Sequence, residues 1–97
     1  MLRHVVLLRF SPESTAEQVQ YLSAGLMQLP SAIPEIKAYR YGPNVGTPND
    51  NWHYAVVADF EDAAAHQVYV ADELHQKVIT ERIHPIVTER AAVQYEI

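Results

Sequence analysis

Hydrophobic and polar positions in the first half of the chain alternate between the spacing of strands and that of a helix. Residues 2–10 are rich in β-branched and apolar side chains and end at a Ser-Pro turn signal, which predicts a strand. Apolar positions then recur at helical spacing over about residues 15–29, behind two overlapping capping-box patterns. Pro30 and Pro34 are expected to end this helix. Residues 36–41 alternate again and carry two tyrosines, so a second strand is predicted.

The second half begins with a loop. Eight of the ten residues at 42–51 are Gly, Pro, Asn or Asp, which is typical of a turn-rich connection. Residues 52–60 follow as the next strand pattern. Acidic residues then open an alanine-rich stretch at residues 63–70, as the positive end of a helix dipole favours, and predict a second helical region. Asp72 is the expected N-cap of a further helix that runs to about Arg82.

The last strand and the order of elements define the fold class. Residues 91–97 alternate through Val93, Tyr95 and Ile97, which predicts a strand. The order is therefore β-α-β-β-α-β, an α+β fold of the ferredoxin-like type, with the second helix broken in two. The chain carries no internal repeat and no linker, so residues 1–97 are interpreted as a single domain.

Both faces of the first and third strands are apolar. The residues concerned are Val6, Leu8 and Phe10 against Val5 and Leu7, and Tyr54, Val56 and Phe60 against Ala55 and Val57. Two helices cover only one face of a four-stranded sheet, and an uncovered antiparallel face is normally polar. We therefore expect a second copy of the chain to cover it, sheet against sheet, in a homodimeric α/β barrel. Strands that are simply apolar on both sides remain the alternative.

Composition and charge restrict the classes of partner that the chain can bind. The 97 residues are 48% hydrophobic and 20% charged, which is typical of a globular domain. Seven Lys and Arg against twelve Asp and Glu give a net charge of −5, which disfavours a nucleic acid partner. No window is long and apolar enough to span a membrane, so we expect a cytoplasmic protein with no membrane partner. Because the chain has no cysteine, thiol nucleophiles and cysteine-based metal sites are excluded.

Five histidines are the first candidates for chemistry. His66, His75 and His84 are spaced nine residues apart, so on a continuous helix adjacent members point to opposite faces. This spacing does not fit a compact metal site, and no metal is predicted. His66 is interpreted as a surface residue near a helix N-terminus, and His84 as a residue at a helix end.

His4 and His75 differ because the pattern places both on apolar faces. His4 is in phase with Val6 and Leu8 on the first strand, and His75 lies beside Ile79 on the apolar stripe of its helix. A lone histidine on an apolar face is usually a satisfied core residue. Two of them on elements that pack together favour a functional pocket about as strongly as a structural role.

The charge state of His75 depends on Asp72. If Asp72 caps the helix, His75 lies in the first turn, where the helix dipole disfavours imidazolium and burial acts in the same direction. The Asp72 carboxylate could instead bond the ring and favour its charged form, and the sequence leaves both alternatives open. Tyr69 lies six residues before His75, so the two side chains converge only if the helix breaks near Asp72.

Four short motifs occur in order along the chain. They are Arg3-His4-Val5-Val6-Leu7-Leu8-Arg9-Phe10, Ile33-Pro34-Glu35-Ile36, Tyr69 with His75, and Val93-Gln94-Tyr95. With them the chain resembles the stress-responsive dimeric α/β-barrel domain family over nearly its whole length. The resemblance implies a ferredoxin-like protomer that pairs with its partner through the sheet.

The resemblance also implies site residues. A plant polyketide cyclase of this family uses a tyrosine and a histidine that correspond here to Tyr69 and His75, and its strand-one histidine corresponds to His4. Tyr54 and Leu26 stand where that cyclase has a histidine and a tyrosine. The His-Pro-x-His motif common in the family is incomplete here, because only its last histidine is present.

These observations lead to one functional hypothesis and two alternatives. We expect an apolar pocket between helices and sheet, lined by Val6, Leu8, Leu26, Tyr54 and Val56. The hypothesis is cofactor-independent cyclisation or isomerisation of a polyketide-like or aromatic carbonyl compound, in which His75 removes a proton and Tyr69 donates to the enolate oxygen, with His4 beside them. The alternatives are a barrel monooxygenase and a non-catalytic stress protein that binds a small hydrophobic ligand.

Overall fold

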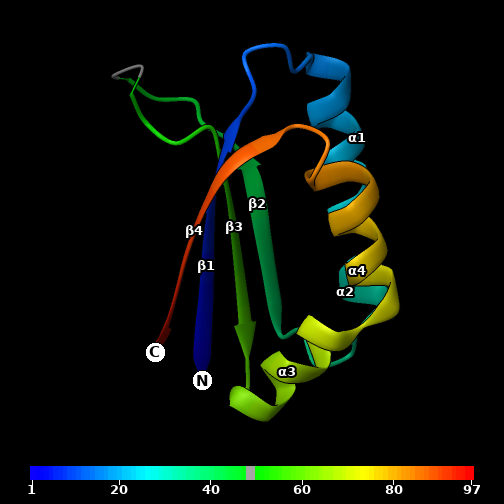
Figure 1. Cartoon of the computed structure of the whole chain (residues 1–97). Helices are drawn as coiled ribbons and strands as arrows, with labels where there is room; N and C mark the ends of the chain where they lie inside the picture. The colour runs from blue at the N-terminus through cyan, green and yellow to red at the C-terminus, as the bar shows by residue number, and fades with distance from the viewer. Residues whose placement is uncertain (48–49) are drawn as a thin grey trace.

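Four antiparallel strands form one sheet in the order β2-β3-β1-β4 (Figure 1). The central strands are β1 (Leu2–Phe10) and β3 (Tyr54–Phe60), and the edge strands are β2 (Ala38–Pro43) and β4 (Val87–Glu96). Helices follow β1 and β3 along the chain. The predicted ferredoxin-like β-α-β-β-α-β fold is therefore confirmed.

The structure, a computed structural model, describes residues 1–47 and 50–97. Residues 48–49 belong to the loop predicted at residues 42–51 and lie outside the described residues. The first two residues of that predicted loop are the end of β2, and β3 begins at Tyr54, so the connection between the two strands covers residues 44–53, two positions later than expected.

Two strand starts lie later in the chain than the sequence predicts. β2 begins at Ala38 rather than Ile36, because the Ile36 N–H donates to the Ile33 carbonyl at 3.1 Å and so closes a turn before the strand. β3 begins at Tyr54 rather than Trp52. Before β3 the backbone of His53 is still hydrogen-bonded, since its N–H donates to the Leu8 carbonyl at 2.9 Å and its carbonyl accepts from the Asn44 N–H at 2.8 Å.

β4 begins earlier than expected, at Val87 rather than Ala91. The intervening Thr88-Glu89-Arg90 is polar and does not have the apolar pattern of a strand. An edge strand tolerates such residues because one of its sides is not paired. β4 consequently pairs with β1 along its whole length, from Leu2 opposite Glu96 to Phe10 opposite Val87.

The first helical region consists of α1 (Ala16–Met27) and the short α2 (Leu29–Ala32). α1 begins at one of the two predicted capping boxes, in which the Gln18 N–H donates to the Thr15 hydroxyl at 3.2 Å and the Thr15 N–H to the Gln18 side chain at 2.9 Å. Pro30 does not end the helix as expected. It lies in the first turn of α2, where its missing N–H breaks no helical bond.

The second helical region is interrupted, as the sequence predicts. α3 (Ala63–Ala71) ends at Asp72, whose extended backbone (φ −62°, ψ 134°) also starts α4 (Glu73–Val78). The chain then continues as a wider turn, the π-helix η1 (Ile79–Ile83), in which the His84 N–H donates to the carbonyl five residues earlier at 2.9 Å. Such wide turns are rare and occur frequently at functional sites.

The helices lie on one face of the sheet (Figure 1). The buried core between them and the sheet consists of Leu8, Leu22, Leu26, Leu29, Ile33, Ile36, Tyr54, Val56, Ala58, Phe60, Tyr69, Val78 and Ile86. On the opposite face, Val5 and Leu7 of β1 pair with Val57 and Ala55 of β3. No helix among residues 1–47 and 50–97 covers this apolar face.

A close crossing joins η1 to α1. The Arg82 guanidinium lies 3.9 Å from the centre of the Tyr21 ring, and its Nη1 donates to the Tyr21 carbonyl at 2.7 Å. Arg82 passes over Gly25, where a Cβ would lie only 2.5 Å from its Cδ. The absence of a side chain at Gly25 therefore allows η1 to pack on α1.

We expect Gly25→Ala to lower the Tm by a few degrees, because the displaced Arg82 loses its contacts with Tyr21. This loss should exceed the gain of about 1 kcal/mol in helix propensity. In an Arg82→Ala background the same substitution should raise the Tm, because only the propensity gain remains. Thermal unfolding of the four proteins measures the coupling. An equal effect of Gly25→Ala in both backgrounds would contradict the contact.

Candidate functional site

A cavity of about 620 Å³ lies between the sheet and the second helical region. Its apolar lining consists of Val6, Leu8, Leu26, Val56, Val70, Ile79, Ile83, Val87 and Ala92. Its polar lining consists of His4, His66, Tyr69, His75, Gln76, His84, Thr88, Glu89, Arg90 and Gln94. The size and the mixture of an apolar wall with a few polar groups are those of a small-molecule site.

Tyr54 is the one predicted lining residue that the structure places elsewhere. Val6, Leu8, Leu26 and Val56 line the cavity, whereas the buried Tyr54 donates to or accepts from the Ser23 hydroxyl at 2.7 Å. Strand phase identified the correct face of the sheet for Tyr54. It did not show that α1, which carries Ser23, covers this end of β3.

Tyr69 and His75 meet at the wall of the cavity. Their rings stack with centroids 3.9 Å apart and planes inclined by 28°. The two residues are on different helices, α3 and α4, and the extended backbone of Asp72 between them turns the chain so that both side chains point the same way. On a continuous helix they would diverge, so the break is what forms the pair.

His4 lies on the floor of the cavity, on β1. Its side chain is buried, and its Nδ1 lies 2.6 Å from Oε1 of Gln94 on β4. Because an amide oxygen only accepts, Nδ1 must donate, so in the neutral ring Nε2 carries the lone pair. The His4 ring lies 6.3 Å from the Tyr69 ring, edge to face, which brings it to the same site.

His66 is not the surface residue that the sequence suggested. It is buried, with its ring 4.6 Å from that of His4 and 5.3 Å from that of Phe60. Its Nε2 has no hydrogen-bond partner within residues 1–47 and 50–97, and neither has Nδ1 of His75. The prediction failed because α3 has apolar residues all round, so its helical pattern did not show which face packs on the sheet.

Burial sets the electrostatics of the three histidines. It lowers the pKa of His4, of His66 and of His75, because each imidazolium would lose solvation inside the protein. At His75 the backbone of Tyr69 and Val70 opposes this lowering of the pKa, and the Asp72 carboxylate does so less strongly. Asp72 is engaged as a cap, accepting from the His75 N–H at 3.0 Å. Of the two alternatives that the sequence left open, capping is the one observed. Three neutral imidazoles therefore face the cavity at neutral pH.

Tyr39, which the sequence did not single out, contacts the same site. Its hydroxyl lies 2.8 Å from that of Tyr69. Burial raises the pKa of both phenols, so both remain protonated at neutral pH. In such a pair one hydroxyl donates to the other, which leaves the second proton free for a further acceptor.

β4 supplies a wall that the sequence prediction also missed. Thr88, Arg90, Ala92 and Gln94 alternate along β4, and all four line the cavity. The alternation was present in the sequence. It was not recognised because the strand was expected to begin only at Ala91.

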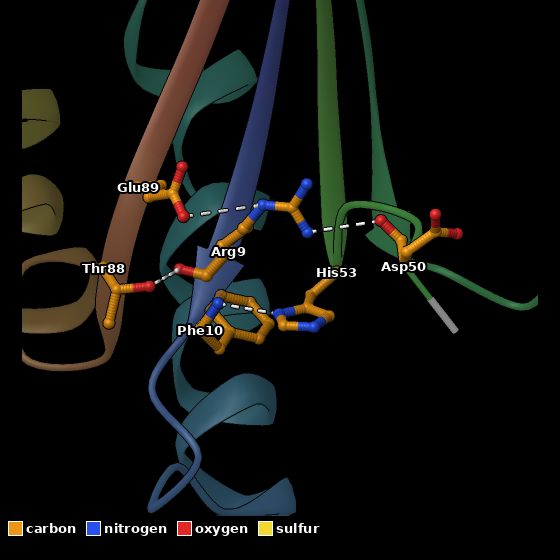
Figure 2. Close-up of polar contacts among 6 residues, drawn as sticks. All are labelled: Arg9, Phe10, Asp50, His53, Thr88 and Glu89. Carbon is orange, nitrogen blue, oxygen red and sulfur yellow. Dashed lines mark hydrogen bonds and ion pairs between the residues drawn. The ribbon is translucent and has the colours of Figure 1, made fainter. Parts of the chain in front are cut away.

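Arg9 ties β1 to β4 and to the loop after β2 (Figure 2). Its Nε lies 3.7 Å from Oε1 of Glu89, and its Nη1 donates to the Asp50 carbonyl at 3.3 Å. Nearby, the Phe10 N–H donates to Nδ1 of His53 at 2.8 Å. His53 thus has a structural contact and does not line the cavity.

Among the described residues, no three His, Cys, Asp or Glu side chains are grouped closely enough to hold a metal ion. None of the helices in the described parts of the chain is both long and apolar enough to cross a membrane.

Comparisons with known proteins give one family and many similar folds. The family model of the stress responsive A/B barrel domain matches residues 2–97. A dimeric ferredoxin-like protein of unknown function from Thermobifida fusca YX is 33% identical, with 99% of this chain and 90% of that chain covered and a TM-score of 0.91. No curated protein is similar enough to this chain to count as a match.

Two further solved structures are of proteins with a named activity. A hydroxynitrile lyase from Passiflora edulis is 20% identical, with 99% of this chain and 92% of that chain covered and a TM-score of 0.85. An antibiotic biosynthesis monooxygenase is 15% identical, with 100% and 98% covered and a TM-score of 0.80. At these identities the likeness is one of fold.

The three lowered histidine pKa values predict acid sensitivity. Above about pH 6.5 neither the folded nor the unfolded chain protonates these groups. As the pH falls below that value, the unfolded chain binds protons first, so the free energy of unfolding should fall. His66→Phe removes one such group and its unpaired nitrogen, so it should raise the Tm more at acidic than at neutral pH. Thermal unfolding across this pH range measures both effects. An equal gain at both pH values would contradict a neutral, buried His66.

Proposed function

The chain belongs to the stress-responsive A/B barrel domain family, and from this premise we propose that it is a homodimeric, cofactor-independent enzyme. Its reaction is proton transfer on an apolar, polyketide-like or aromatic carbonyl compound, as in cyclisation or isomerisation. The single observation that carries the proposal is the stacked pair of Tyr69 and His75 at the wall of an apolar cavity.

His75 is the proposed base. A base must be neutral before it accepts a proton, and burial lowers the pKa of His75. Because Nδ1 is buried in the protein, we assign the acceptor role to Nε2. In the proposed step Nε2 takes the proton α to the carbonyl, and the electron pair of the broken C–H bond moves into an enolate. The imidazolium returns the proton to the product.

Tyr69 is the proposed donor to the enolate oxygen. If the Tyr39 hydroxyl donates to that of Tyr69, the Tyr69 proton remains available for the substrate. A fixed donor at the point where negative charge develops stabilises the transition state more than the ground state. Tyr39 is then a positioning residue. His4 adds a second unprotonated nitrogen, Nε2, near the same site.

A second candidate function is binding of a small hydrophobic ligand without catalysis. One observation favours this function. The Tyr69 hydroxyl already has a hydrogen-bond partner in the Tyr39 hydroxyl and does not need a substrate to supply one. The monooxygenase alternative rests only on the shared fold. If a carbonyl compound binds in the cavity but its α-protons are not exchanged, binding without catalysis is the function.

Homodimer formation is proposed through the open face of the sheet. On this face Val93 is 57% exposed and Tyr95 is 47% exposed. They continue the apolar surface formed by Val5, Leu7 and Val57. Sheet-to-sheet packing would remove this surface from water. The dimeric description of the similar Thermobifida fusca protein supports the same arrangement.

The enzymatic proposal predicts exchange of α-protons in a ketone that has an apolar ring. We expect the protein to accelerate deuterium incorporation into 2-tetralone in D2O, followed by proton NMR. His75→Ala should reduce the rate by about 10²–10⁴, because it removes the base. Tyr69→Phe should also slow exchange while leaving the fold intact, because it removes the donor and keeps the stacked ring.

Two variants outside the cavity serve as matched controls for this exchange. His53→Gln and Tyr21→Phe change the same residue types at positions that do not line it. Both should exchange at the wild-type rate. If His75→Ala and His53→Gln have the same rate, His75 is not the base.

The dimer proposal predicts that Val57→Asp separates the protomers or unfolds them. An unpaired charge in an apolar interface costs about 3–5 kcal/mol. Val45→Asp is the matched control, since Val45 is 98% exposed and lies outside the sheet. Sedimentation velocity at micromolar concentration should show a dimer for the wild type and for Val45→Asp. A monomeric wild type would contradict the proposal.

A further inference from the structure

The β4 wall brings one fixed positive charge to the cavity. Arg90 pairs in register with Leu8, whose side chain lines the cavity, so Arg90 lies on the same face of the sheet. It is the only lysine or arginine among the described residues that line the cavity. The buried histidines around it are neutral, so Arg90 alone supplies a permanent cation.

Arg90 has no carboxylate partner among the described residues, unlike two other arginines of the sheet. Arg3 forms a two-bond fork with Asp59, with N–O distances of 2.7 and 2.8 Å. Arg9 lies 3.7 Å from Glu89, which is the acidic residue beside Arg90 and borders the cavity. The ion-pair partner of Glu89 is therefore Arg9 and not Arg90.

The unpaired cation stands out against the charge of the whole protein. The net charge is −5, so a general attraction of anions to the surface is not expected. The guanidinium shares the cavity wall with the proposed reaction centre. Burial lowers the pKa of His75 and raises the pKa of Tyr69, and the positive charge of Arg90 adds to the first effect and partly offsets the second. Arg90 thus lies at an apolar cavity, near the pair of residues proposed to do the chemistry.

We propose that Arg90 binds the carboxylate of an otherwise apolar substrate. The carbonyl group of the same substrate then lies beside His75 and Tyr69. The inference rests on the proposed function and narrows its substrate to keto acids or related carbonyl compounds with an acidic group. A guanidinium is suited to this role because its planar N–H groups match the two oxygens of a carboxylate. The apolar walls formed by Val6, Leu8 and their neighbours hold the rest of the molecule.

The test compares two probes that differ in charge but share a ring system, 2-naphthoate and 2-naphthalenemethanol. Isothermal titration calorimetry gives the Kd of each for the wild type, Arg90→Gln, Arg90→Lys and Lys77→Gln. Lys77 is exposed on α4 and does not line this cavity, so Lys77→Gln removes the same charge at another place.

We expect the wild type to prefer naphthoate. Arg90→Gln should weaken naphthoate binding by about tenfold or more, as expected for a hydrogen bond between charged groups. The Kd of the alcohol should stay unchanged, which also shows that the cavity is intact. Arg90→Lys should keep part of the preference, and Lys77→Gln all of it.

Other outcomes separate this inference from the proposed function. If the wild type binds both probes equally, or if Arg90→Gln weakens both by the same factor, the carboxylate site is wrong and the apolar cavity remains. If the wild type binds neither probe, the cavity itself does not take small aromatic molecules, and the proposed function fails with it.

Discussion

The interruption of the second helical region at Asp72 is the constraint on which the site depends. Asp72 ends α3, begins α4 and spends its carboxylate on the His75 N–H at 3.0 Å. One residue therefore separates the two helices, allows Tyr69 to stack on His75 and directs its carboxylate to the His75 backbone N–H. A continuous helix of the same length would have separated the two side chains around its axis.

The interior of the cavity is costly for the fold. Three histidines are held neutral by burial, and two of their nitrogens have no hydrogen-bond partner within the described residues. Each unpaired buried polar atom destabilises a fold by about 1–3 kcal/mol. Natural proteins depart from local rules of stability mainly where function requires it. The wide turn η1 at the rim of the same cavity is a departure of the same kind.

The two faces of the sheet have different roles. The helix-covered face holds the core and the cavity, whereas the open face has an apolar centre bordered by the Arg3–Asp59 fork. Because side chains alternate along a strand, the same four strands supply both surfaces. Edge strand β4 contributes to both, with Gln94 and Arg90 toward the cavity and Val93 toward the open face. The proposed dimer and the proposed site are therefore built from the same backbone without competing for side chains.

The sequence alone determined the features that depend on neighbours within a few residues. Periodicity gave the element order and placed His4 beside Val6 and Leu8, while cap chemistry gave the starts of α1 and α4 and the helix break. The tertiary structure decided which element stands opposite each face. It buried His66 against His4 and Phe60, turned Tyr54 toward Ser23, and extended β4 so that Arg90 reaches the cavity. The physical reason is that a local pattern specifies the direction of a side chain, whereas burial and charge depend on partners distant in sequence.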